Sequence, residues 1–131
     1  MKPLTFLFSL AASLVMFSSA SFAEWVKLST TLEEDTSFYV DIGRIKKHKG
    51  FVYYWGLDDF VFPDEEGDLS VTKYVQVDCN LLRRRILNGN SYVGPMGSGK
   101  LSSSYQPENP KWDYAPPGSS MEEILETVCN I

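Results

Sequence analysis

The sequence is poor in the residues that most metal and catalytic centres use. Its 131 residues include only two cysteines and one histidine, which falls short of the four ligands that a structural zinc site takes. The chain also lacks the Cys-x-x-Cys motif of thiol redox proteins and the Gly-x-Ser-x-Gly elbow of α/β-hydrolases. We therefore predict no metal, no cofactor and no catalytic residues.

Positive charge is scarce as well. The chain has 12 basic and 17 acidic side chains and a net charge of −5, which disfavours a nucleic-acid-binding protein. Residues 94–100 have the spacing of a phosphate-binding loop, but Leu101 stands where that motif needs Ser or Thr. The length suits one domain, and an apolar content of 44% is typical of a folded chain.

The N-terminus has the features of a secretory signal peptide. Lys2 precedes an apolar stretch over residues 4–17, and a small-x-small pattern ends at Ala23. We predict a signal peptide over 1–23, with cleavage after Ala20 as the alternative. The apolar stretch is shorter than the ~20 residues that span a bilayer, so we do not expect an uncleaved anchor.

The rest of the chain, residues 24–131, is expected to form one exported domain. No later segment is apolar enough to cross a membrane, and no cysteine follows the apolar stretch to carry a lipid. We expect a soluble bacterial protein that is exported to the periplasm or secreted.

Both cysteines fall in the exported part. An oxidising compartment favours one disulfide between Cys79 and Cys129. A reactive thiol pair and an intermolecular bridge are the alternatives.

Apolar and polar residues alternate in several segments, and this period of two predicts β-strands. Residues 44–50 are interpreted as a hairpin connection, Asn88-Gly89-Asn90 as a tight turn, and 94–110 as a loop. The predicted strands cover residues 25–29, 38–42, 51–57, 71–79, 83–87 and 112–115.

The C-terminus has the pattern of an amphipathic helix. Ser119 or Ser120 can cap it, with Glu122 or Glu123 three residues further on. Its apolar face follows helical spacing and consists of Met121, Ile124, Leu125, Val128 and Cys129. The predicted fold is α+β: a six-stranded, mainly antiparallel sheet with one C-terminal helix packed on one face.

The opposite face of such a sheet is left for a partner. Arg83 and Arg85 project together from it, and Tyr54 and Tyr74 are further candidates because exposed Tyr and Arg are frequent interface anchors. Ion pairing of the arginines with Asp78 is the purely structural alternative.

An envelope hydrolase is a second functional hypothesis. Its support is Asp41, His48 and the carboxylates between residues 58 and 68. Because a single histidine needs a nucleophile and an orienting group beside it, the hypothesis requires these residues to converge. A periplasmic inhibitor or assembly module is a third hypothesis.

In order, these features resemble the surface-adhesin protein E family of Gram-negative bacteria. The resemblance covers residues 24–131. It rests on Trp25-x-x-Leu28, Tyr39-Val40-Asp41, Trp55-Gly56-Leu57, Ser70-x-x-Lys73, Asp78-Cys79, Arg83-x-Arg85, Met96-Gly97-x-Gly99, Trp112-x-Tyr114-x-Pro116 and the helix that ends at Cys129.

The resemblance implies a six-stranded antiparallel sheet with a C-terminal helix and a non-enzymatic adhesin. It further implies contact with host matrix or serum proteins, and dimerisation. We expect a protein partner, which is a matrix protein, another envelope protein or a second copy of the chain.

Overall fold

The computed structural model describes residues 22–131, so nearly all of the predicted signal peptide over 1–23 lies outside the described residues. No helix in the described part is both long and apolar enough to cross a membrane. The elements are β1 (Trp25–Thr30), β2 (Thr36–Asp41), the 3-10 turn η1 (Ile42–Arg44), β3 (Lys46–His48), β4 (Phe51–Phe60), β5 (Ser70–Asp78), β6 (Arg83–Tyr92), the 3-10 turn η2 (Pro95–Gly97), β7 (Leu101–Tyr105), β8 (Asp113–Tyr114) and α1 (Ser120–Cys129).

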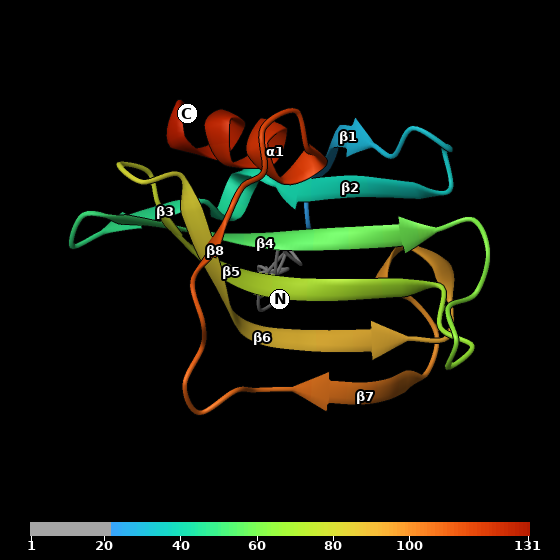
Figure 1. The fold of residues 1–131 in the computed structure, drawn as a ribbon. Coiled ribbons are helices and arrows are strands. Elements are labelled where there is room, and N and C mark those ends of the chain that lie inside the picture. Colours follow the sequence, from blue (N-terminus) through green and yellow to red (C-terminus); the bar gives the residue numbers. More distant parts are fainter. Residues whose placement is uncertain (1–21) are drawn as a thin grey trace, which may run out of the picture.

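All strand pairs are antiparallel, and the main path of the sheet is β1-β2-β4-β5-β6-β7. The short strand β3 pairs with β4, and β8 pairs with β6. The helix α1 lies against one face of the sheet, beside β1 and above β2 in Figure 1. The predicted α+β class is therefore confirmed.

The sheet has eight strands where six were predicted. The two additions, β3 and β7, lie in segments interpreted as a hairpin connection and a loop. Both strands lie at the margin of the sheet and are mostly polar. They therefore lack the alternation of apolar and polar residues from which strands were predicted.

The predicted turn at Asn88-Gly89 is wrong. β6 runs through it to Tyr92, because β5 and β7 both pair with this part of the strand. Tyr74 pairs with Asn88 and Val75 with Ile86, so Leu87 is a bulge. Long-range pairing has overridden the local turn preference.

The core lies between α1 and the covered face of the sheet. Ser119 caps the helix, as predicted, by accepting a hydrogen bond from the Glu122 amide at 3.1 Å. The helix then buries Ile124, Leu125 and Val128 against the sheet. The buried sheet residues of this core are Val40, Val52, Tyr54, Val75 and Val77.

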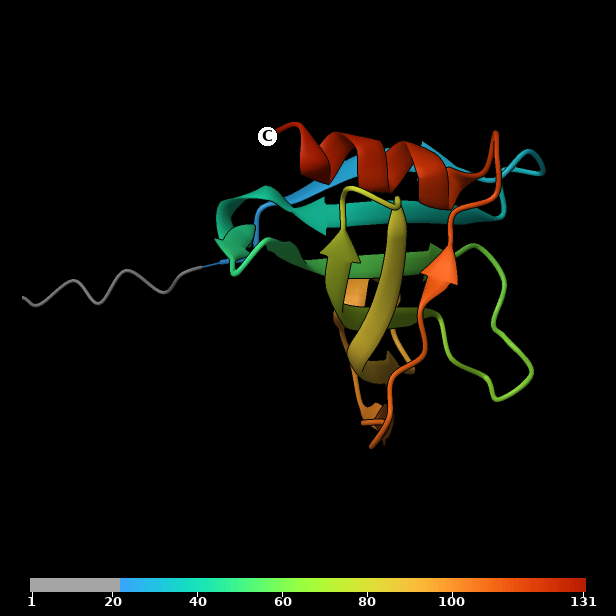
Figure 2. The ribbon, with the colours of Figure 1, turned by 60° about the vertical axis from the view of Figure 1, so that its left-hand side comes forward.

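A disulfide joins the sheet to the helix, as predicted. Cys79 follows β5 and Cys129 ends α1, and their Cα atoms are 5.8 Å apart across 50 positions of sequence. Figure 2 shows how β5 and β6 curve upward until the turn between them reaches the helix. The bond therefore connects the curved end of the sheet to the element that covers its concave face.

Reduction of this bond should destabilise the protein strongly. Closing a loop of this length stabilises the folded state by about 4 kcal/mol on the chain-entropy model. We expect Cys79→Ser to lower the melting temperature by roughly 10–20 °C, measured by circular dichroism. Dithiothreitol should have the same effect on the wild type and none on the variant; equal melting temperatures with and without reductant would refute the prediction.

Candidate binding face

The sheet has an open face on the side away from α1. We define this open face by Tyr53, Trp55, Tyr74, Gln76 and Arg85. The register places Tyr53 opposite Gln76, Trp55 opposite Tyr74, and Gln76 opposite Arg85. Because residues directly opposite in a sheet share a face, these side chains form one surface across β4, β5 and β6.

Three rings on this face lie side by side and form what we call the aromatic row. The Tyr74 ring centroid lies 5.0 Å from that of Trp55 and 6.0 Å from that of Tyr53. All three residues are half-buried. The row presents apolar ring surface and phenolic hydroxyls together, the combination that is frequent at binding surfaces.

Arginines stack on an indole at the edge of this face. The guanidinium carbons of Arg83 and Arg85 lie 4.4 and 4.5 Å from the Trp112 ring centroid, within the range of cation–π attraction. Trp112 also stacks on Phe51, with centroids 5.8 Å apart. The segment before β8 is thereby held against the open face.

Polar contacts fix the same arginines. Arg83 Nε donates to Asp78 Oδ2 at 3.0 Å, so the ion pair considered as the structural alternative exists. Arg85 Nε donates to Gln76 Oε1, and Gln76 Nε2 donates to the Tyr53 hydroxyl at 2.8 Å. Arg83 is therefore mainly structural, whereas Arg85 connects β6 with the aromatic row.

Asp78 is a largely buried carboxylate with a lowered pKa. Burial alone would raise this pKa, but hydrogen bonds from the Arg83 side chain and from the Leu81 and Asn80 amides outweigh burial. Asp78 is therefore charged in the folded protein, and it connects Arg83 to the turn that carries Cys79.

Tyr54 is not a contact residue, and its prediction as one is wrong. It pairs with Val75, is only 2% exposed and lies in the core beneath α1. The alternation in β4 places Tyr54 on the face of Val52, and only the packing of the helix decides which face is covered. Burial raises the pKa of its hydroxyl, opposed by the neighbouring Arg84.

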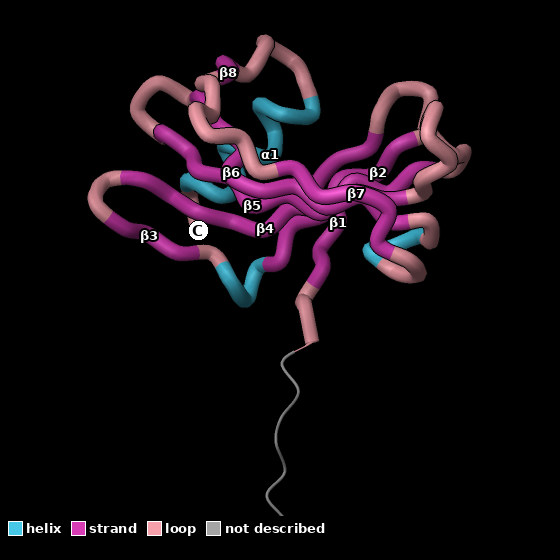
Figure 3. The backbone as a smooth tube through the Cα atoms, turned by 90° about the horizontal axis from the view of Figure 1, so that it is seen from below, coloured by secondary structure: helices cyan, strands magenta, loops and turns pink. Residues whose placement is uncertain are grey.

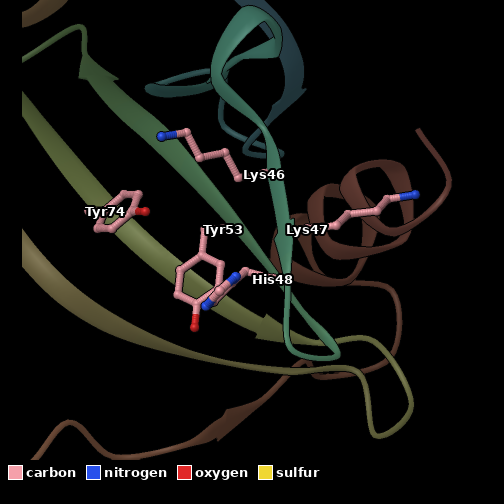
Figure 4. A pocket seen from close by; sticks show the side chains of 5 residues that line it. All are labelled: Lys46, Lys47, His48, Tyr53 and Tyr74. Atoms are coloured by element: carbon pink, nitrogen blue, oxygen red, sulfur yellow. The ribbon is translucent and has the colours of Figure 1, made fainter.

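The hairpin of β3 and β4 adds a cationic surface beside the open face, which was not predicted from the sequence as part of the binding site. We call residues 44–49 the basic arm. A hollow of about 570 Å³ lies between the arm and the sheet, lined by Lys46, Lys47, His48, Tyr53 and Tyr74. Figure 4 shows Lys46 and His48 on the side of the two tyrosines, with Lys47 directed away. Lys46 and His48 are two positions apart, a spacing that places both on one side of a strand. This spacing was the signal in the sequence that could have revealed the cationic surface.

A second hollow adjoins the first along the arm. It measures about 530 Å³, shares Lys46 and Tyr74 with the first, and reaches Arg44 and Trp55. The aromatic row therefore forms the floor of both hollows.

The loop around η2 covers the far end of the open face. Gly97 approaches Leu57, which is fully buried although it lies on this side of β4. The Met96 amide donates to Asp59 Oδ1 and the Gly97 amide to Ser70 Oγ, both at 2.8 Å. Figure 3 shows β3 and η2 at opposite ends of the sheet, so the uncovered area is the end that carries β3.

The residues of the hydrolase hypothesis do not converge. Asp41 is buried, accepts hydrogen bonds from the Glu24 and Gly43 amides, and pairs with Arg44. His48 is exposed on the basic arm, in a hollow with no carboxylate among its lining residues. No group of three metal-ligating side chains occurs within residues 22–131.

One sheet, covered on one side by a disulfide-linked helix and aromatic and cationic on the other, is an architecture suited to binding. The chain belongs to the surface-adhesin protein E family, whose model matches residues 25–130. The family predicted from the sequence features is confirmed. No curated protein matches the chain.

Solved structures of Haemophilus influenzae protein E share the fold. One crystal form is 15% identical, with a TM-score of 0.57, over 81% of this chain and 87% of that one. Protein E from non-typeable Haemophilus influenzae is 15% identical, with a TM-score of 0.51, over 83% and 86% of the two chains.

Substitutions of Tyr54 and Tyr74 should show which of the two rings lies in the core and which lies at the surface. Tyr54→Ala should lower the free energy of unfolding by about 3–5 kcal/mol, because it opens a cavity under the helix. Tyr74→Ala should cost much less, since the ring is half-exposed. Urea unfolding followed by fluorescence measures both; equal losses would show that the two faces are assigned incorrectly.

Asp78 should make stability depend on acid pH. Its folded-state pKa is below the ordinary value of 3.8, so its contribution is complete above that value and is lost as pH falls through the folded pKa. Melting temperatures measured between about pH 5 and 2 should fall less steeply for Asp78→Asn than for the wild type.

The control for this comparison is Glu126→Gln, which removes a carboxylate exposed on α1. It should retain the wild-type pH dependence. If Asp78→Asn retained it too, the Arg83 pairing would not contribute to stability.

Proposed function

We propose that this protein is an exported, non-enzymatic binding protein whose open face contacts a protein partner. The family supports a surface adhesin, and a host matrix or serum protein is the partner class that this role implies. The observation that carries the proposal is the aromatic row, which lies beside Arg85 on the face of the sheet away from α1.

The composition of the face supports this role. Interfaces concentrate their binding energy in a few Tyr, Trp and Arg side chains near the centre of the contact. Tyr74 is central here, with Trp55 and Tyr53 in ring contact with it. Arg85 is held by Gln76 and Trp112, so it pays little conformational entropy on binding.

Charge adds selectivity for an acidic partner. The chain carries a net charge of −5, yet the basic arm, with its four cations, lies at one end of the open face, and Lys46 is directed toward that face. Such asymmetry orients a charged partner and makes association sensitive to salt.

Location and assembly follow from the same proposal. We place the protein in the periplasm, the secreted fraction or, as the family implies, at the cell surface, after removal of residues 1–23. Another envelope protein or a second copy of the chain is the alternative partner; as a periplasmic inhibitor or assembly module, the protein would co-purify with its target from periplasm.

Substitutions on the open face should weaken binding without unfolding the protein. In solid-phase assays against a panel of matrix and serum proteins, Tyr74→Ala and Arg85→Glu should each weaken binding by about tenfold or more, the effect of losing an interface anchor. Lys100→Glu, an equal charge reversal at an exposed loop position, should have little effect.

Wild-type binding should also weaken as salt concentration rises. Binding that is insensitive to salt and unchanged in both variants would contradict the proposed face. Unchanged melting temperatures would exclude unfolding as the cause of any loss.

A further inference from the structure

The basic arm concentrates cations, and most of them are not paired with a carboxylate in the described part of the chain. Of the 12 Lys and Arg residues in the chain, four occur within positions 44–49. Arg44 pairs with Asp41. Lys46, Lys47 and Lys49 form no ion pair within residues 22–131. All three are exposed. The arm is therefore a solvated cationic strip on an acidic protein.

The arm has a defined conformation. Lys46 pairs with Tyr53 and His48 with Phe51 across the β3–β4 ladder. Lys49 and Gly50 close the hairpin with φ angles of 49° and 82°, both left-handed, as a tight two-residue turn requires. Lys46 and Lys47 are thus carried on a paired strand, and Lys49 on its turn, at a fixed place beside the aromatic row.

Aromatic rings and cations meet in the two hollows. Tyr53 and Tyr74 form the floor of the larger hollow beneath Lys46 and His48, and Trp55 forms part of the second. Their volumes, about 570 and 530 Å³, are within the range of roughly 300–1,000 Å³ that is common for ligand sites. The two hollows share Lys46 and Tyr74, so together they suit an extended ligand.

We propose that the basic arm and the aromatic row bind a sulfated polysaccharide. The sulfate groups would pair with Lys46 and the neighbouring cations of the arm, a chemistry for which clustered Lys and Arg are suited. The apolar C–H face of a sugar ring would lie on Tyr74 and Trp55. The site shares Tyr74 with the protein-binding face but does not rest on that proposal.

An acidic peptide fits the same features less well. Such a peptide commonly adds as a strand to a free edge, but β3 has only three residues and two lysines, features that protect an edge from such pairing. A nucleic acid is a polyanion like a sulfated polysaccharide, so the net charge of the protein does not separate the two, and competition between them does.

The test is binding of heparin and dextran sulfate to the purified protein, measured by calorimetry and on an immobilised ligand. The wild type should bind both, and binding should weaken as salt rises. Unmodified dextran, which lacks the sulfates, should not bind. Failure of the wild type to bind either sulfated ligand would overturn the inference, and the lysines would then serve only to protect the edge of β3.

Variants locate the site. Lys46→Glu and Tyr74→Ala should each weaken binding of heparin by about tenfold, and Lys46→Glu should reduce the slope of log affinity against log salt by roughly one, the loss of one ionic contact. Tyr74→Phe retains the ring and should restore binding. Lys100→Glu is the matched control for charge and should change affinity less than about twofold.

Competitors separate the ligand classes. If polyglutamate or single-stranded oligothymidylate binds as tightly as heparin, the arm recognises negative charge alone and the inference is wrong. If Lys100→Glu weakens heparin binding as much as Lys46→Glu, the site is not the arm. Loss of heparin binding by Lys46→Glu with retained matrix-protein binding would support the inference independently of the proposed function.

Discussion

The covalent link between Cys79 and Cys129 is the constraint on which the architecture depends. A ten-residue helix is marginal in isolation, and α1 survives because its apolar face is buried and its last turn is bonded to the sheet. Because the link uses the turn after β5, it also holds the curved end of the sheet against the helix. One face is closed in this way, and the other is left for contacts.

Sequence reasoning predicted the parts of the fold that carry strong alternation or helical spacing. It found β1, β2, β4, β5, the capped helix and the disulfide. It missed β3 and β7, and it ended β6 at Asn88-Gly89, because pairing with strands distant in sequence determines those segments. Local turn preference is weak against such a ladder.

The candidate site was predicted only in part, for a related reason. Alternation placed Arg83 with Arg85, and Tyr74 with Gln76 and Asp78, and the register shows that these two sets share a face. It could not say that Tyr54 lies beneath the helix. Nor could it show that Trp112, some thirty positions away, stacks on both arginines. The hollows beside the basic arm are lined by residues of β3, a strand that the alternation pattern did not reveal.

The central claim is that binding occurs on the open face and leaves the helix-covered face undisturbed. Side-chain NMR during titration with dextran sulfate tests it most directly. The ring signals of Tyr74 and Trp55 should shift, while the methyl signals of Leu125 and Val128 in the core stay unchanged. Shifts confined to Leu125 and Val128, with the two rings unaffected, would contradict the account.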